Sequence, residues 1–138
     1  MKKYYVVIDT NVLASSLLSK NKDSSTALIL DAVIDQRLVP LYSKDILIEY
    51  EDVLNRKKFR FSKENIETLL KIVKLLGVEV MPDPVNEVLP DMDDIIFYEV
   101  VMEKREDDAY LVTGNLKHFP SKHFIVTPAE MIKILNTE

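Results

Sequence analysis

Cysteine is absent from this sequence, and histidine occurs only twice. Without thiols the protein can form no disulfide or zinc–thiolate site, and it cannot use a cysteine nucleophile. Two histidines supply a zinc site poorly, because zinc in proteins prefers sulfur and imidazole ligands. The composition is compatible with a reducing compartment.

The sequence also lacks a long apolar run. No stretch is long enough to span a bilayer, and the apolar run 4–8 is interrupted by Asp9 and Asn11 too early for a signal peptide. We therefore expect a cytoplasmic protein that has no membrane partner.

The sequence has fewer basic than acidic residues, with 18 Lys and Arg, 23 Asp and Glu and a net charge of -5. This balance argues against a protein that simply coats nucleic acid, because carboxylates repel the phosphate backbone. The objection weakens if several carboxylates converge on a metal ion, which would present positive charge to a phosphate.

Short apolar runs alternate with helical patterns along the 138 residues, a length that suits a single domain spanning 1–138. We expect helices opening at Ser24, Ser43, Ser62, Asp91 and Thr127, and strands at 4–8, 38–42, 78–81, 109–113 and 124–126. Gly77 is expected to end the third helix in a left-handed conformation. The alternation predicts an α/β fold, a parallel sheet with helices on both faces, and ligands beyond the carboxyl ends of its strands.

Asp9 directly follows the first strand and should stand at this edge, flanked by the hydroxyl of Thr10 and the amide of Asn11. It could equally be a helix N-cap. Glu49 falls on the border of the apolar stripe of its helix. A carboxylate that half faces the core needs a partner, which could be a metal ion or a buried Lys or Arg.

Three aspartates crowd the start of one helix at Asp91, Asp93 and Asp94. The helix dipole favours one or two of them, and we assign Asp91 as the structural cap. Asp94 can face the sheet edge, where Thr113 and Asn115 follow the fourth strand. Oxygen ligands from separate elements suit Mg²⁺ or Mn²⁺, and such an ion can activate water for attack on a phosphodiester.

These residues resemble the PIN-domain family, which includes the VapC-like toxins of toxin–antitoxin pairs. The resemblance covers almost the whole chain and rests on 7–13, Ser43 with Glu49, 91–94, 111–115 and 126–130. It implies a three-layer α/β/α sandwich with four to five parallel strands and a metal-dependent endoribonuclease. It also implies that Asp9, Glu49 and Asp94 are the metal-binding acids, and that an antitoxin partner and a homodimer are to be expected.

One departure concerns Asn115, where many PIN nucleases carry a further aspartate. Asparagine can ligate a metal ion through its carbonyl oxygen but brings no charge, which puts a second metal ion in doubt. Asp107 and Asp108 precede the fourth strand, and we interpret them as solvated loop acids.

RNA contact requires cations, and the basic run Arg56, Lys57, Lys58 and Arg60 is the best candidate, with Phe59 and Phe61 available for stacking. The alternative is a helix C-terminus whose basic residues satisfy the dipole while the aromatics pack inward. Lys117, His118, Lys122 and His123 form a weaker second patch, in which His118 is a conceivable general base.

Two other functions remain open. A phosphatase of the haloacid dehalogenase type also places an aspartate after its first strand, but its second aspartate would fall at Asn11. The other is a PIN-like module that has lost catalysis and binds RNA or a partner protein. Such a module should hold RNA with or without Mg²⁺.

Overall fold

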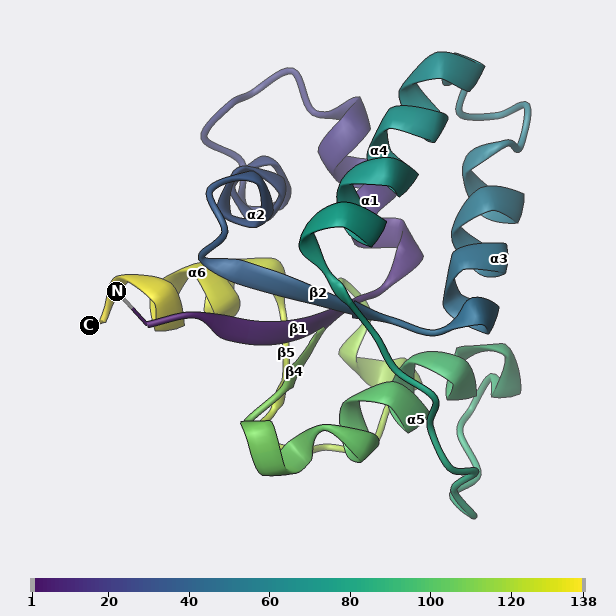
Figure 1. Ribbon diagram of the computed structural model, residues 1–138, viewed down its shortest axis with the longest axis vertical. Coiled ribbons are helices and arrows are strands. Elements are labelled where there is room, and N and C mark those ends of the chain that lie inside the picture. Colours follow the sequence, from purple (N-terminus) through teal and green to yellow (C-terminus); the bar gives the residue numbers. More distant parts are fainter. Residues whose placement is uncertain (1, 138) are drawn as a thin grey trace.

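The computed structural model describes residues 2–137, shown in Figure 1. The strands are β1 (Tyr4–Ile8), β2 (Leu38–Tyr42), β3 (Val78–Glu79), β4 (Tyr110–Val112) and β5 (Ile125–Val126). The helices are α1 (Thr10–Leu18), α2 (Ser25–Ile34), α3 (Lys44–Leu54), α4 (Lys63–Leu76), α5 (Ile95–Glu103) and α6 (Pro128–Asn136). Three short 3₁₀ helices are η1 (Met92–Asp94), η2 (Arg105–Asp107) and η3 (Leu116–His118).

The five strands form a parallel sheet in the order β3-β2-β1-β4-β5. Helices α1 to α4 lie on one side of this sheet and α5 lies on the other (Figure 1). The predicted three-layer α/β/α sandwich is therefore confirmed. The order of the strands reverses between β1 and β4, and ligands of such sheets bind beyond the carboxyl ends of the strands at this point.

The central strand β1 is covered on both faces. Val6, Val7 and Ile8 are all buried, as expected of a β-branched run inside a parallel sheet. Within residues 2–137, none of the helices is long and apolar enough to cross a membrane.

The predicted helix starts have the expected caps. The side chains of Ser24, Ser43 and Ser62 each accept a hydrogen bond from the backbone N–H three residues later. Thr127 and Glu130 form the predicted capping box, with Pro128 at the first helical position. Short polar side chains thus position four of the helices.

Helix α1 was not among the predicted elements. It begins at Thr10, immediately after β1, and has no acidic residue in its first turn. Its N-cap residue Asp9 makes no side-chain cap hydrogen bond among the residues that the structure describes. The helix is held by the burial of Val12, Leu13 and Ala14, so tertiary packing replaces the local signals that sequence patterns detect.

Two other expectations differ from the structure. Strand β3 ends at Glu79, two residues earlier than predicted. The prediction of a left-handed Gly77 is wrong, because this residue has φ -100° and ψ -174°, which is extended backbone. A Cβ atom there would lie 2.4 Å from the backbone oxygens of both Pro40 and Val73. Glycine is needed because α4 passes tightly against β2 as it turns into β3.

Candidate active site

A polar pocket of about 190 Å³ lies beyond the carboxyl end of β1. It gathers residues from the β1–α1 junction, α3, η1, α5 and η3, which are far apart in the sequence. The lining comprises Asp9, Thr10, Asn11, Glu49, Val53, Arg56, Asp91, Asp93, Asp94, Phe97 and His118. The three acids predicted as metal ligands therefore share one pocket, together with four of the five residues predicted to support them.

The parallel register of β1 and β4 places Asp9 at the pocket. Ile8 pairs with Val112, and the backbone N–H of Asp9 donates to the carbonyl of Val112 over 3.0 Å. The next residue of the β4 segment, Thr113, then donates its hydroxyl hydrogen to Asp9 Oδ2 over 2.7 Å. Both side chains are buried. The carboxylate of Asp9 is thus held by Thr113 and faces the pocket instead of capping α1.

Thr10 and Asn11 line the same pocket, the first buried and the second exposed. Within residues 2–137, the buried Oγ1 of Thr10 has no hydrogen-bond partner. A buried hydroxyl without a partner is costly, because it has lost its water without gaining a protein contact. The pocket wall therefore offers an unused oxygen beside Asp9.

Glu49 is half-buried at the pocket, where the helical pattern predicted it. None of the ion pairs found among the described residues involves Glu49, which disagrees with the alternative of a buried Lys or Arg partner. Burial and the neighbouring Asp52 carboxylate raise the pKa of Glu49, and Asp93 and Asp9 add to this effect. Arg56 opposes it.

The neighbouring Tyr50 fixes the rotation of α3 that brings Glu49 to the pocket. Its side chain is buried, and its hydroxyl donates to the carbonyl of Ile8 at the end of β1. Burial, together with the Asp9 carboxylate, raises the pKa of Tyr50. The hydrogen bond to Ile8 thereby couples the positions of Glu49 and Asp9, a role that the sequence pattern did not reveal.

The three aspartates of η1 and its N-cap have different roles. Asp91 accepts a hydrogen bond from the backbone N–H of Asp93 over 3.0 Å, which confirms its assignment as the cap. Asp93 is exposed. The Asp94 side chain is only 16% exposed, and its Oδ2 lies 3.0 Å from Nδ1 of His118.

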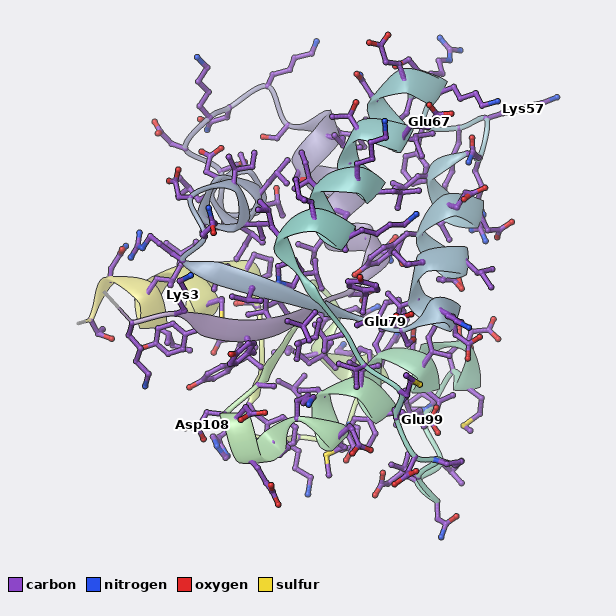
Figure 2. The ribbon with its side chains drawn as sticks, viewed as in Figure 1. Lys3, Lys57, Glu67, Glu79, Glu99 and Asp108 are labelled. Carbon is purple, nitrogen blue, oxygen red and sulfur yellow. The ribbon has the colours of Figure 1, made fainter. Side chains whose placement is uncertain are left out.

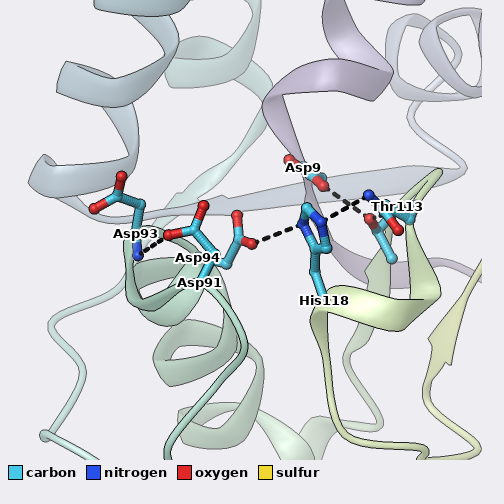
Figure 3. Close-up of polar contacts among 7 residues, drawn as sticks. Asp9, Asp91, Asp93, Asp94, Thr113 and His118 are labelled. Atoms are coloured by element: carbon cyan, nitrogen blue, oxygen red, sulfur yellow. Dashed lines mark hydrogen bonds and ion pairs between the residues drawn. The ribbon is translucent and has the colours of Figure 1, made fainter.

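His118 was treated in the sequence as a weak surface candidate, but it lies inside the site (Figure 3). Its Nδ1 faces Asp94, and its Nε2 lies 2.9 Å from the side-chain nitrogen of Asn115. The backbone N–H of Asn115 also donates to Thr113 Oγ1 over 3.0 Å. Asn115 is exposed and does not line the pocket, but it connects two residues that contact the acids.

The acids of the pocket destabilise one another's charged forms. Burial raises the pKa of Asp94 to about 6, with the Asp9 carboxylate as the next cause and His118 acting in the opposite direction. A carboxyl whose charged form is disfavoured in this way is typical of sites that bind a cation or transfer protons.

The predicted RNA-contact residues divide into two groups. Arg56 lines the pocket and forms an ion pair with Asp52 at 3.5 Å. Lys57, Lys58 and Arg60 are exposed outside it, and Figure 2 shows Lys57 extending into solvent beyond the end of α3.

The aromatic residues of the basic run are already engaged within the protein. The rings of Phe59 and Phe61 stack on each other at 5.2 Å, and both side chains pack against the core. This packing agrees with the alternative in which the aromatic residues anchor the loop. Asp107 and Asp108 are exposed, and they precede β4, at the opposite end of this strand from Thr113.

The donor set of the pocket suits a hard divalent cation, because it consists of carboxylate oxygens with the unpartnered hydroxyl of Thr10. Among residues 2–137, however, no three Asp, Glu or His side chains already stand close enough together to hold a metal ion. The carboxylates that line the pocket therefore have to move closer together before three of them can ligate one ion.

Comparisons with known proteins agree with this architecture. The sequence profile of the PIN domain matches residues 5–117. The chain belongs to the PIN-domain family. The PIN-domain match spans all three predicted metal-binding acids and ends one residue before His118, and the fold is of the nuclease type. The family assignment also sets aside the phosphatase alternative.

This PIN-domain protein is 32% identical over 116 residues to the uncharacterized protein MJ1680 of Methanocaldococcus jannaschii, an alignment that covers 82% of this chain and 72% of the relative. The crystal structure of PAE2754 from Pyrobaculum aerophilum superposes on it with a TM-score of 0.60 and 15% identity. That superposition covers 99% of this chain and 91% of the other. At this identity the likeness shows a shared fold and nothing more.

Proposed function

We propose that this PIN-domain protein is a metal-dependent endoribonuclease that uses Mg²⁺ or Mn²⁺. The observation that carries the proposal is the convergence of Asp9, Glu49 and Asp94 in one pocket at the carboxyl edge of the sheet. The raised pKa of Asp94 and the unpartnered hydroxyl of Thr10 support it, because a bound cation would relieve both.

Asp9, Glu49 and Asp94 would hold the cation, with Asn115 as a weaker candidate ligand through its amide oxygen. A divalent ion in this place supplies an activated water and neutralises charge on the phosphodiester oxygens during attack. The chain itself contributes the orientation of these ligands. Thr113 holds the Asp9 carboxylate, and the cap at Asp91 fixes the turn that presents Asp94.

Arg56 is the cation best placed to contact RNA, because it alone of the four predicted basic residues lines the pocket. Its ion pair with Asp52 is exposed on both sides, so the pair is worth little and the guanidinium is free to turn toward a phosphate. Lys57, Lys58 and Arg60 would contribute a more distant positive surface.

The test is cleavage of a generic single-stranded RNA by purified protein with Mg²⁺, with Mn²⁺ and with EDTA. We expect cleavage only with a divalent ion, and loss of cleavage in Asp9→Asn, Glu49→Gln and Asp94→Asn. Asp107→Asn is the matched control, because it removes an exposed carboxylate outside the pocket. Full activity in all three pocket variants would refute the site assignment.

A second function is a catalytically weak PIN-like module that binds RNA or a partner protein. Two observations favour it: Asn115 stands where many family members carry an acid, and the described acids do not form a ready-made metal group. RNA binding that persists in EDTA, without cleavage under any metal condition, would favour this module over the nuclease.

The toxin role, an antitoxin partner and a homodimer form part of the same proposal and rest on the family resemblance alone. Such a nuclease would act on RNA in the cytoplasm. Induced expression should then arrest growth, and the Asp9→Asn variant should not. Growth unaffected by an active nuclease would refute the toxin role while leaving the enzymatic proposal in place.

A further inference from the structure

Two of the pocket acids are connected by a single short segment that follows β4. Thr113, at its start, donates to Asp9, while His118, at its end, faces Asp94. Asn115 joins the two halves, because its backbone N–H donates to Thr113 and its side-chain nitrogen contacts His118. Figure 3 shows this arrangement, with His118 lying between the η1 aspartates and the Asp9–Thr113 pair.

The contacts of His118 define which ring nitrogen carries hydrogen. The side-chain nitrogen of Asn115 is a donor, so Nε2 of His118 must be the acceptor in their 2.9 Å contact. The hydrogen of the neutral ring is then on Nδ1, which lies 3.0 Å from Asp94 Oδ2. Only one oxygen of Asp94 is used in this contact, so Oδ1 remains available to the pocket.

We propose that His118 is a positioning residue, which Asn115 holds in the Nδ1–H form so that it orients the Asp94 carboxylate toward the metal-binding pocket. This inference rests on the proposed metal-dependent function and adds a residue to it. Partners of this kind hold ligating carboxylates in place, and their loss typically weakens metal affinity about 10- to 100-fold.

The chemistry of the contact favours orientation over direct ligation. A ring nitrogen can bind a metal ion only through its lone pair. In the arrangement described, the lone pair of Nε2 is directed at Asn115 and Nδ1 carries hydrogen. His118 therefore acts on the cation through Asp94.

The first experiment uses no metal and no substrate. NMR detection of the imidazole ¹⁵N nuclei of the full-length protein in EDTA reports which ring nitrogen carries hydrogen. We expect the Nδ1–H form for His118. His123, the other histidine of the chain, gives a second ring signal that His123→Ala identifies by its loss. An Nε2–H ring at position 118 would overturn the proposal.

The second experiment measures Mn²⁺ binding by calorimetry in paired variants. Asparagine places its amide nitrogen near the position of Nδ1 and glutamine near that of Nε2. His118→Asn should therefore keep affinity within about threefold, whereas His118→Gln and His118→Ala should weaken it about tenfold. His123→Ala is the matched control and should bind Mn²⁺ as the wild type does, because its ring lies outside the pocket lining.

The double variant tests whether His118 acts through Asp94. If it does, adding His118→Ala to Asp94→Asn should cause no further loss of affinity. Additive losses would overturn the proposal, as would unchanged or tighter binding in His118→Ala, since tighter binding would mean that the imidazole competes with the metal ion.

The two proposals fail in different ways. Wild-type protein that binds no Mn²⁺ but shows the Nδ1–H ring refutes the metal-dependent function and, with it, the role of His118 toward a metal ion. Wild-type protein that binds Mn²⁺ and cleaves RNA, while His118→Gln binds equally well, preserves the nuclease and overturns the positioning role alone.

Discussion

Removal of the Asp94 charge should stabilise the metal-free protein. Burial and the nearby Asp9 carboxylate raise the pKa of Asp94 from 3.8 to about 6, so the folded state holds its proton more tightly than the unfolded chain does. The stability that this proton provides is fully present below about pH 4 and is lost as the pH rises through about 6. At pH 7.5 the folded protein carries an unfavourable charge that Asp94→Asn removes.

The size of the stabilisation by Asp94→Asn follows from the shift in the pKa of Asp94. One pKa unit corresponds to about 1.4 kcal/mol, so a shift of about two units sets a ceiling of about 3 kcal/mol. The asparagine variant loses the contact between the carboxylate and His118, and the side chain at this position remains 16% exposed. We therefore expect a stabilisation of about 1 to 2 kcal/mol at pH 7.5, or a rise in Tm of roughly 3 to 8 °C.

The assay is thermal unfolding followed by circular dichroism in EDTA, at pH 4.5 and at pH 7.5. Wild type and Asp94→Asn should differ at pH 7.5 and converge toward pH 4.5, while Asp107→Asn should follow wild type at both values. Mn²⁺ should then reverse the order, because an ion at a hundred times its Kd stabilises the wild type by about 2.7 kcal/mol, whereas the variant lacks one ligand and gains little.

Two results would refute this reasoning. An Asp94→Asn variant less stable than wild type at pH 7.5 in EDTA would mean that the contact of the carboxylate with His118 outweighs the cost of burying the charge. A difference that does not change between the two pH values would mean that the charge of Asp94 is not its cause.

Three further predictions concern other parts of the molecule. Gly77→Ala should destabilise the protein by about 1 to 3 kcal/mol in urea unfolding, because the new Cβ would lie 2.4 Å from the backbone oxygen of Pro40; unchanged stability would mean that the backbone relaxes freely there. Arg56→Ala should raise the KM for RNA about tenfold, with Lys57→Ala as the exposed control, and equal effects of the two would argue against a specific phosphate contact. Asn115→Asp should weaken Mn²⁺ binding in calorimetry because a carboxylate cannot donate to Nε2 of His118, and tighter binding would instead make residue 115 a metal ligand.

The parts of the fold that the sequence predicted are those with strong local signals. The buried strand β1 is a run of β-branched and aromatic residues, and Ser24, Ser43 and Ser62 are short polar caps before apolar helices. Helix α1 lacks such signals and depends on what surrounds it. For Gly77 the local signal was misleading. Its position after α4 fits the common left-handed end of a helix, whereas glycine is needed there because the backbone of Pro40 in β2 lies too close for a Cβ atom.

The same distinction separates the parts of the site. Asp9 and Glu49 could be predicted because a strand end and a helical face are local properties of the sequence. His118 could not, because η3 is a single turn with no period and its neighbour Lys117 resembles an ordinary surface residue. The sequence did contain one indication. Thr113 and His118 are separated by a short segment, so that a single turn after β4 can contact Asp9 at its start and Asp94 at its end.

Asn115 shows why residue type alone was insufficient. In the sequence it indicates a missing charge, since family members often carry an acid at this position. In the structure it links Thr113 and His118, and through them it contacts the residues that hold Asp9 and Asp94. A carboxylate at 115 would add charge to a pocket where burial and Asp9 already raise the pKa of Asp94, and it could no longer donate to Nε2 of His118. Asparagine therefore fits a site in which one loop contacts two of the acids without adding negative charge.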